Sequence, residues 1–94
     1  MTAPHQIRIG PVTLGNDLPV VFLCGPCQIE SRAHALETAS ALAEMARAAG
    51  VPLIYKSSFD KANRTSVNAA RGIGMAEGLA ILAEVREATG LPVL

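Results

Sequence analysis

An apolar run gives way to a polar one in the stretch 51–58, Val-Pro-Leu-Ile-Tyr-Lys-Ser-Ser. The first five of these residues form a short, continuous apolar run, which is typical of a strand covered on both faces. The polar segment that begins at Lys56 continues to Gly74, which is long for an ordinary connection in a compact domain. Because long loops after strands often carry function, the stretch predicts a buried strand that leads into a functional loop.

A second apolar run of the same kind lies upstream, at residues 19–24 (PVVFLC). Between the two runs, Ser31 is a good N-cap for a helix that extends to about Ala49, and Gly50 supplies its C-terminal stop. One apolar stripe runs along this helix, formed by Ala35, Leu36, Ala39, Leu42, Ala43 and Ala46. The segment therefore predicts the order strand, helix, strand.

Helical spacing returns at residues 75–88, where Leu79, Leu82 and Val85 fall on or near one face before Gly90 stops the helix. A third apolar run opens at residues 91–94. Strands that alternate with helices in this way form a parallel sheet through right-handed crossovers. We therefore predict an α/β fold, with too few strand-helix units to close a barrel.

Short β-type runs at residues 7–9 and 12–14 flank Gly10-Pro11, and Gly15-Asn16-Asp17 closes the second run. This pattern predicts a β-hairpin that precedes the main fold. We accordingly expect one domain over residues 1–94, with the hairpin at 1–18 and the first βα units at 19–94.

Composition narrows the class of protein and of partner. Half of the 94 residues are apolar but only 3% are aromatic, which favours helices packed on parallel strands over a sandwich. The formal net charge is zero, so neither nucleic acid nor an anionic membrane is an expected partner. No signal-peptide pattern or bilayer-length apolar run is present, and we expect a cytoplasmic protein with reduced cysteines.

The distribution of charge is more informative than its sum. Four of the eight basic residues fall within sixteen positions that contain a single acid, Asp60; they are Lys56, Lys61, Arg64 and Arg71. Together with the serine, threonine and asparagine side chains between them, these cations match phosphate and carboxylate oxygens. The segment predicts a site for an anionic ligand, and the alternative is a solvated polar loop.

The dithiol pattern Cys24-Gly25-Pro26-Cys27 competes with this interpretation, because its spacing and middle dipeptide are those of a thioredoxin-type oxidoreductase. A nearby helix N-terminus would lower the pKa of such a thiol. Against this function, Cys24 continues the strand directly and the chain contains no tryptophan. Dithiol chemistry remains the alternative, whereas we expect Cys24 to be a small buried apolar residue.

Two segments carry a resemblance to a known family, residues 25–31 (GPCQIES) and 56–66 (KSSFDKANRTS), and Asn16-Asp17-Leu18-Pro19 and Arg71-Gly72 also fit it. Over nearly the whole chain the sequence resembles the phosphoenolpyruvate-condensing synthases that make 3-deoxy-D-manno-octulosonate 8-phosphate. The sister synthases of 3-deoxy-D-arabino-heptulosonate 7-phosphate usually have Lys-Pro-Arg-Thr-Ser where this chain has KANRTS at 61–66. They remain a second alternative.

The resemblance implies a (β/α)8 TIM barrel with an N-terminal hairpin, usually a homotetramer, of which this chain holds the opening units. It also implies condensation of phosphoenolpyruvate with D-arabinose 5-phosphate in lipopolysaccharide Kdo biosynthesis. Two phosphates and a carboxylate must then share one site, and cations lower the cost of bringing them together. We expect the fragment alone to be inactive.

Site residues follow from the resemblance position by position. Those implied to bind phosphoenolpyruvate are Lys56, Ser58 and Lys61, with Lys61 also catalytic, and those implied to bind arabinose 5-phosphate are Asn63, Arg64, Thr65 and Ser66. Cys27 stands where metal-dependent members have cysteine, which implies a divalent metal ion whose other ligands lie beyond Leu94. Ser57 stands where some relatives have alanine, and we assign it no chemistry.

Overall fold

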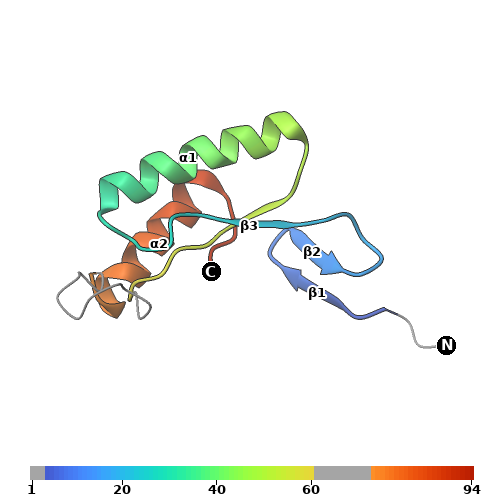
Figure 1. Cartoon of the computed structure of the whole chain (residues 1–94), viewed down its shortest axis with the longest axis horizontal. Helices are drawn as coiled ribbons and strands as arrows, with labels where there is room; N and C mark the ends of the chain where they lie inside the picture. Colours follow the sequence, from blue (N-terminus) through green and yellow to red (C-terminus); the bar gives the residue numbers. More distant parts are fainter. Residues whose placement is uncertain (1–3, 61–72) are drawn as a thin grey trace.

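The computed structural model describes residues 4–60 and 73–94. Its elements alternate between strand and helix after an initial hairpin (Figure 1). In chain order they are β1 (Gln6–Ile9), β2 (Val12–Gly15), β3 (Phe22–Cys24), α1 (Arg32–Ala49), β4 (Leu53–Tyr55) and α2 (Met75–Thr89). The predicted α/β class is therefore confirmed.

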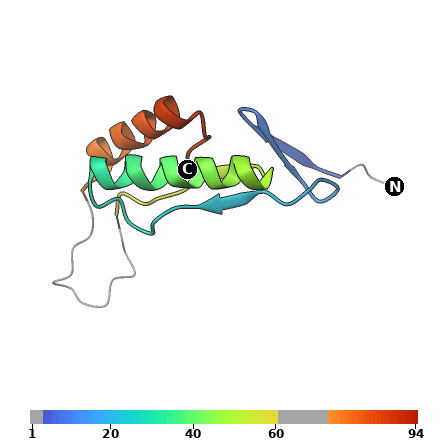
Figure 2. The ribbon, with the colours of Figure 1, turned by 90° about the horizontal axis from the view of Figure 1, so that it is seen from above.

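The N-terminal hairpin pairs β1 with β2 in antiparallel register, from Gln6 opposite Gly15 to Ile9 opposite Val12. Its turn contains Gly10, which takes a positive φ of 57° that other residues seldom adopt. Figures 1 and 2 show the hairpin at one end of the molecule and the first turns of α1 and α2 at the other. The predicted hairpin is confirmed.

Strands β3 and β4 pair in parallel, from Phe22 opposite Leu53 to Cys24 opposite Tyr55. Residues 91–94, which we call the C-terminal run, lie on the other side of β4, where Val93 forms a parallel bridge to Tyr55. Strand β4 is thus the central strand of the three, and all three of its residues are buried, as predicted.

Strand β3 differs from its prediction in two ways. It begins at Phe22 and not at residue 19, and Phe22 and Leu23 are 43% and 45% exposed. The expectation that both faces are covered is wrong for β3, because the core beneath the helices includes Tyr55 of β4 and no residue of β3.

Helix α1 begins and ends as predicted. The Ser31 hydroxyl accepts a hydrogen bond from the His34 backbone N–H at 3.1 Å, which satisfies one of the free amides of the first turn. Gly50 ends the helix with a positive φ of 70°. The alanines of the predicted stripe are buried, and Leu36 and Leu42 pack against the same core; the buried ones are Ala35, Ala39, Ala43 and Ala46.

Helix α2 runs beside α1 in the same direction (Figures 1 and 2) and ends at Gly90, as predicted. Its buried face consists of Gly78, Ile81, Leu82 and Val85. Leu79 is 51% exposed and lines the same pocket as Leu82, so it lies near that face without being part of its buried set. Gly78 is buried on this face, because the absence of a side chain lets α2 approach Phe59 closely.

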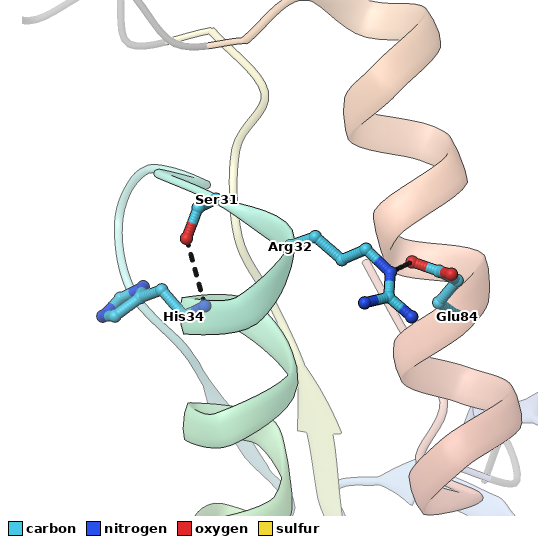
Figure 3. A network of polar contacts seen from close by, with 4 residues as sticks. All are labelled: Ser31, Arg32, His34 and Glu84. Atoms are coloured by element: carbon cyan, nitrogen blue, oxygen red, sulfur yellow. Dashed lines mark hydrogen bonds and ion pairs between the residues drawn. The ribbon is translucent and has the colours of Figure 1, made fainter.

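The main core lies between the two helices and β4. Its buried members are Ile29, Ala35, Ala39, Tyr55, Ile81, Leu82 and Val85. On the outside of this layer, Arg32 of α1 and Glu84 of α2 form an ion pair of 2.6 Å (Figure 3). No helix in the described part of the chain is long and apolar enough to cross a membrane.

Candidate active site

The carboxyl ends of β3 and β4 lie at the same edge, because the two strands are parallel. Residues 25–28 follow β3 there, and residues 56–60 follow β4. We call these two segments the carboxyl edge. Parallel α/β enzymes place their ligands and catalytic groups at this end of their strands.

Backbone hydrogen bonds continue across the carboxyl edge after the strands end. The Lys56 N–H donates to the Cys24 carbonyl at 3.0 Å, and the Ser58 N–H donates to the Cys27 carbonyl at 3.2 Å. On the other side, the Ser57 N–H donates to the Leu94 carbonyl at 3.2 Å. Three segments that are distant in sequence are thus held together at this edge.

Gly25 allows the two post-strand segments to approach closely. A Cβ atom at this position would collide with the Lys56 carbonyl oxygen, which is a backbone atom and cannot swing away as a side chain could. Glycine is the residue that permits such an approach. The identity of residue 25 is therefore set by the backbone of the strand beside it.

A pocket of about 410 Å³ opens at the carboxyl edge. Its lining combines a polar segment with an apolar part from α2 and the C-terminal run; it consists of residues 56–60 with Leu79, Leu82 and Leu94. Lys56 is exposed and Ser58 is half-buried. A lysine ammonium and a serine hydroxyl beside one pocket are suitable donors for an anionic ligand.

The structure brings together only part of the predicted substrate site. Lys56 and Ser58 line the same pocket. The remaining predicted substrate residues lie outside the described residues, as does Arg71; they are Lys61, Asn63, Arg64, Thr65 and Ser66.

Phe59 joins the described segments on either side of that interval. The Gly74 N–H donates to the Phe59 carbonyl at 3.4 Å, and Gly78 packs against the Phe59 side chain. The chain therefore leaves the described structure at Asp60 and re-enters it at Ile73 beside a pocket-lining residue.

Cys27 is exposed and Cys24 is half-buried, and neither forms a disulfide. Cys24 is thus less enclosed than predicted, since no residue of β3 belongs to the main core. Helix α1 starts only at Arg32 with Ser31 as its cap, so neither cysteine caps a helix as the dithiol interpretation would favour. In residues 4–60 and 73–94, no three acidic, histidine or cysteine side chains gather as a metal site would require.

Two buried polar residues were given no role by the sequence. Ser57 is 5% exposed, and its hydroxyl donates to the Pro26 carbonyl at 2.6 Å. The Tyr55 hydroxyl is also buried and has no hydrogen-bond partner in the described part of the chain. The burial of Ser57 could have been predicted from the sequence. Side chains alternate along a strand, so if the alternation continues past Tyr55, residue 56 points outward and residue 57 inward.

Burial also changes the acidity of Tyr55. It raises the pKa of the phenol above its ordinary value of 10.0, because a phenolate would lose its hydration in the core. The phenol is therefore a neutral core group at physiological pH.

These features define an α/β protein with an anion-compatible pocket at the carboxyl ends of parallel strands. The chain belongs to the DAHP synthetase I family, whose model matches residues 3–94.

Among curated proteins, the chain is 60% identical over 93 residues to one from Bradyrhizobium diazoefficiens and 63% identical over 84 residues to one from Caulobacter vibrioides. Both are named 2-dehydro-3-deoxyphosphooctonate aldolase. The matches cover 99% and 89% of this chain, but 33% and 29% of the relatives. The chain thus spans about a third of the length of these relatives. The resemblance predicted from the sequence is confirmed, and neither alternative is favoured.

Proposed function

We propose that this chain is part of a synthase that condenses phosphoenolpyruvate with D-arabinose 5-phosphate and water. The products are 3-deoxy-D-manno-octulosonate 8-phosphate and inorganic phosphate. The observation that carries the proposal is 55–63% identity to relatives named for an aldolase of a 3-deoxyphosphooctonate, over most or all of this chain. The pocket at the carboxyl edge, lined by Lys56 and Ser58, supports it.

The fold proposed for the whole protein is a (β/α)8 barrel. The hairpin at residues 1–18 precedes it, and residues 19–94 supply its first βα units. Support comes from the parallel order of β3, β4 and the C-terminal run, with a helix after β3 and another after β4. In such barrels the catalytic groups lie at the carboxyl ends of the strands, where this pocket opens.

The reaction joins C3 of phosphoenolpyruvate to the aldehyde carbon of the sugar phosphate. Water adds to C2, the bond between C2 and the phosphate oxygen breaks, and inorganic phosphate leaves. Two phosphates and a carboxylate repel one another in one site, so the protein must supply cations that gather and orient them. In this proposal Lys56, Ser58 and Lys61 bind phosphoenolpyruvate, with Lys61 catalytic.

The arabinose 5-phosphate is assigned to the next residues along the chain, Asn63, Arg64, Thr65 and Ser66. Arginine offers a planar pair of donors for the sugar phosphate, and the neutral side chains suit its hydroxyls. The homotetramer and the cytoplasmic location remain predictions.

A divalent metal ion belongs to the proposal, with Cys27 as one ligand. The exposed thiol at the carboxyl edge suits a borderline ion, which would polarise and orient the sugar aldehyde when bound. One thiol is not a complete site, so further ligands must come from other residues. In a complete enzyme that contains this chain, we expect the Cys27→Asn variant to turn over in the presence of a chelator. A variant that stays chelator-sensitive with undiminished metal content would contradict the assignment.

A hybrid protein tests the proposed function. In it, this chain replaces the matching part of the Caulobacter vibrioides relative, and the loss of phosphoenolpyruvate is followed. We expect consumption that depends on arabinose 5-phosphate. Consumption with a four-carbon sugar phosphate instead would favour the heptulosonate synthases, and none with either would reject the proposal.

Within the hybrid, Lys61→Ala should lower kcat/KM by roughly 100-fold or more, because it removes a cation from the developing negative charge. Arg47→Ala is the matched control, since Arg47 is an exposed cation in the last turn of α1. Equal turnover of the two variants would remove Lys61 from the site.

A further inference from the structure

The carboxyl edge contains a β-bulge. Strands β3 and β4 pair Cys24 with Tyr55, and the next bridge pairs Gln28 with Ser58. Three residues therefore separate the paired positions on the β3 side, and two separate them on the β4 side. A bulge of this kind bends the strand, re-aims its side chains and is frequent next to active sites.

A bulge leaves backbone groups without a partner in the ladder. Here the Cys24 carbonyl accepts from Lys56 and the Cys27 carbonyl accepts from Ser58, with Pro26 between them. The Ser57 hydroxyl donates to the Pro26 carbonyl at 2.6 Å, which is short for this type of hydrogen bond. The serine thus replaces the ladder bond that the bulge interrupts.

The surroundings of Ser57 make this bond hard to replace. Ser57 is 5% exposed, so water has little access to its hydroxyl. Its own backbone N–H is bonded to the Leu94 carbonyl, which fixes the residue from the opposite side. Loss of the hydroxyl would leave the carbonyl of half-buried Pro26 without this donor, which is unfavourable for a polar group that is partly removed from water.

We propose that Ser57 is a positioning residue of the active site: its hydroxyl fixes the bulge and thereby sets Cys27 relative to Lys56 and Ser58. The inference rests on the proposed function, because these three residues are assigned to metal and substrate there. The resemblance assigned roles to Lys56 and Ser58 but none to Ser57, and this inference gives Ser57 a role.

The test compares Ser57→Ala with Ser57→Thr in the hybrid protein. Alanine removes the hydroxyl, whereas threonine keeps it. Ser40→Ala is the matched control, because Ser40 is an exposed serine on α1. Two quantities are measured: the hydrogen-exchange rates of the Ser58 and Ile29 amides, which bond across the bulge, and KM for phosphoenolpyruvate separately from kcat.

For Ser57→Ala we expect exchange at the two amides to accelerate by about tenfold, as the bulge opens locally. We expect kcat/KM to fall by about tenfold, mainly through a higher KM, as is typical when a supporting hydrogen bond is lost. Ser57→Thr should restore both quantities, and Ser40→Ala should change neither.

Unchanged exchange and unchanged KM in Ser57→Ala would overturn the inference, as would a threonine variant no better than alanine. If the hybrid with Ser57 intact fails to condense its substrates, the proposed function fails. The exchange rates would still decide whether Ser57 holds the bulge, so the two failures are distinguishable.

Discussion

The helix layer and the carboxyl edge are built by different means. Between α1 and α2, side chains such as Ala39 and Val85 are fully buried and contribute through apolar contact alone. At the carboxyl edge, backbone hydrogen bonds, Gly25 and the buried Ser57 hydroxyl hold the segments. Apolar burial is non-directional, whereas hydrogen bonds and close backbone approach specify individual atoms. The layer should therefore affect stability, and the edge should affect both stability and the site.

The largest effect is expected for Gly25→Ala, which attacks the carboxyl edge. The new methyl group meets the Lys56 carbonyl, and we expect the free energy of unfolding to fall by about 3 kcal/mol as the backbone shifts. Denaturant unfolding of the hybrid measures this change, and KM for phosphoenolpyruvate should rise with it.

Gly50→Ala is its control, because a Cβ there meets nothing and only the positive φ opposes it. We expect a cost of about 1 kcal/mol and an unchanged KM. Equal effects of the two substitutions would show that the close approach at residue 25 has no special importance.

Val85→Ala tests the helix layer. Removing two methyl groups from a fully buried side chain should lower the free energy of unfolding by about 2 kcal/mol, through lost burial and a residual cavity. Thermal or denaturant unfolding gives the change. KM for phosphoenolpyruvate should stay constant, and a marked rise would mean that the layer and the edge are not independent.

Tyr55→Phe examines a core residue that directly precedes the carboxyl edge. Because the buried hydroxyl has no hydrogen-bond partner in the described part of the chain, its removal should change stability at neutral pH by less than about 1 kcal/mol. The pKa of Tyr55 is raised in the folded state. Its contribution to the free energy of unfolding is therefore complete when the pH is below the ordinary pKa of 10.0, and it is lost as the pH rises through the folded-state pKa. The variant should therefore lose less stability than the parent in alkaline solution. Identical pH dependence of the two proteins would contradict this.

The smallest effect is expected for the ion pair between Arg32 and Glu84 (Figure 3). Its side chains are 63% and 42% exposed, so water and salt screen the attraction despite the 2.6 Å separation. A double-mutant cycle with Arg32→Ala and Glu84→Ala should give a coupling energy of about 0.5 kcal/mol that decreases with added salt. A coupling unaffected by salt would point to packing of the side-chain stems.

Local features were predictable because their causes lie within a few residues. The Ser31 cap, the Gly50 stop and the alanine stripe depend on contacts along one helix, and all three are confirmed. The hairpin is equally local, since its turn and both strands lie within residues 6–15.

Other features depend on neighbours that are distant in the sequence. The exposure of Leu23 and Leu79 follows from which elements cover them, and helical or strand spacing cannot determine that. The bond from Ser57 to Pro26 joins residues 31 positions apart and exists because the sheet contains a bulge there. Of the seven predicted substrate residues, Lys56 and Ser58 lie in the described part of the chain and line one pocket, and the other five, Lys61 and Arg64 among them, lie outside the described residues.

The sequence by itself determined the order of strands and helices, the helix ends and the place of the cationic segment, because short-range sterics and apolar periodicity control them. Only the tertiary structure decided which backbone groups meet at the carboxyl edge, and hence why residue 25 is glycine and residue 57 carries a buried hydroxyl. The physical reason is that register and close approach arise between segments, and one residue of slip changes every pair beyond it.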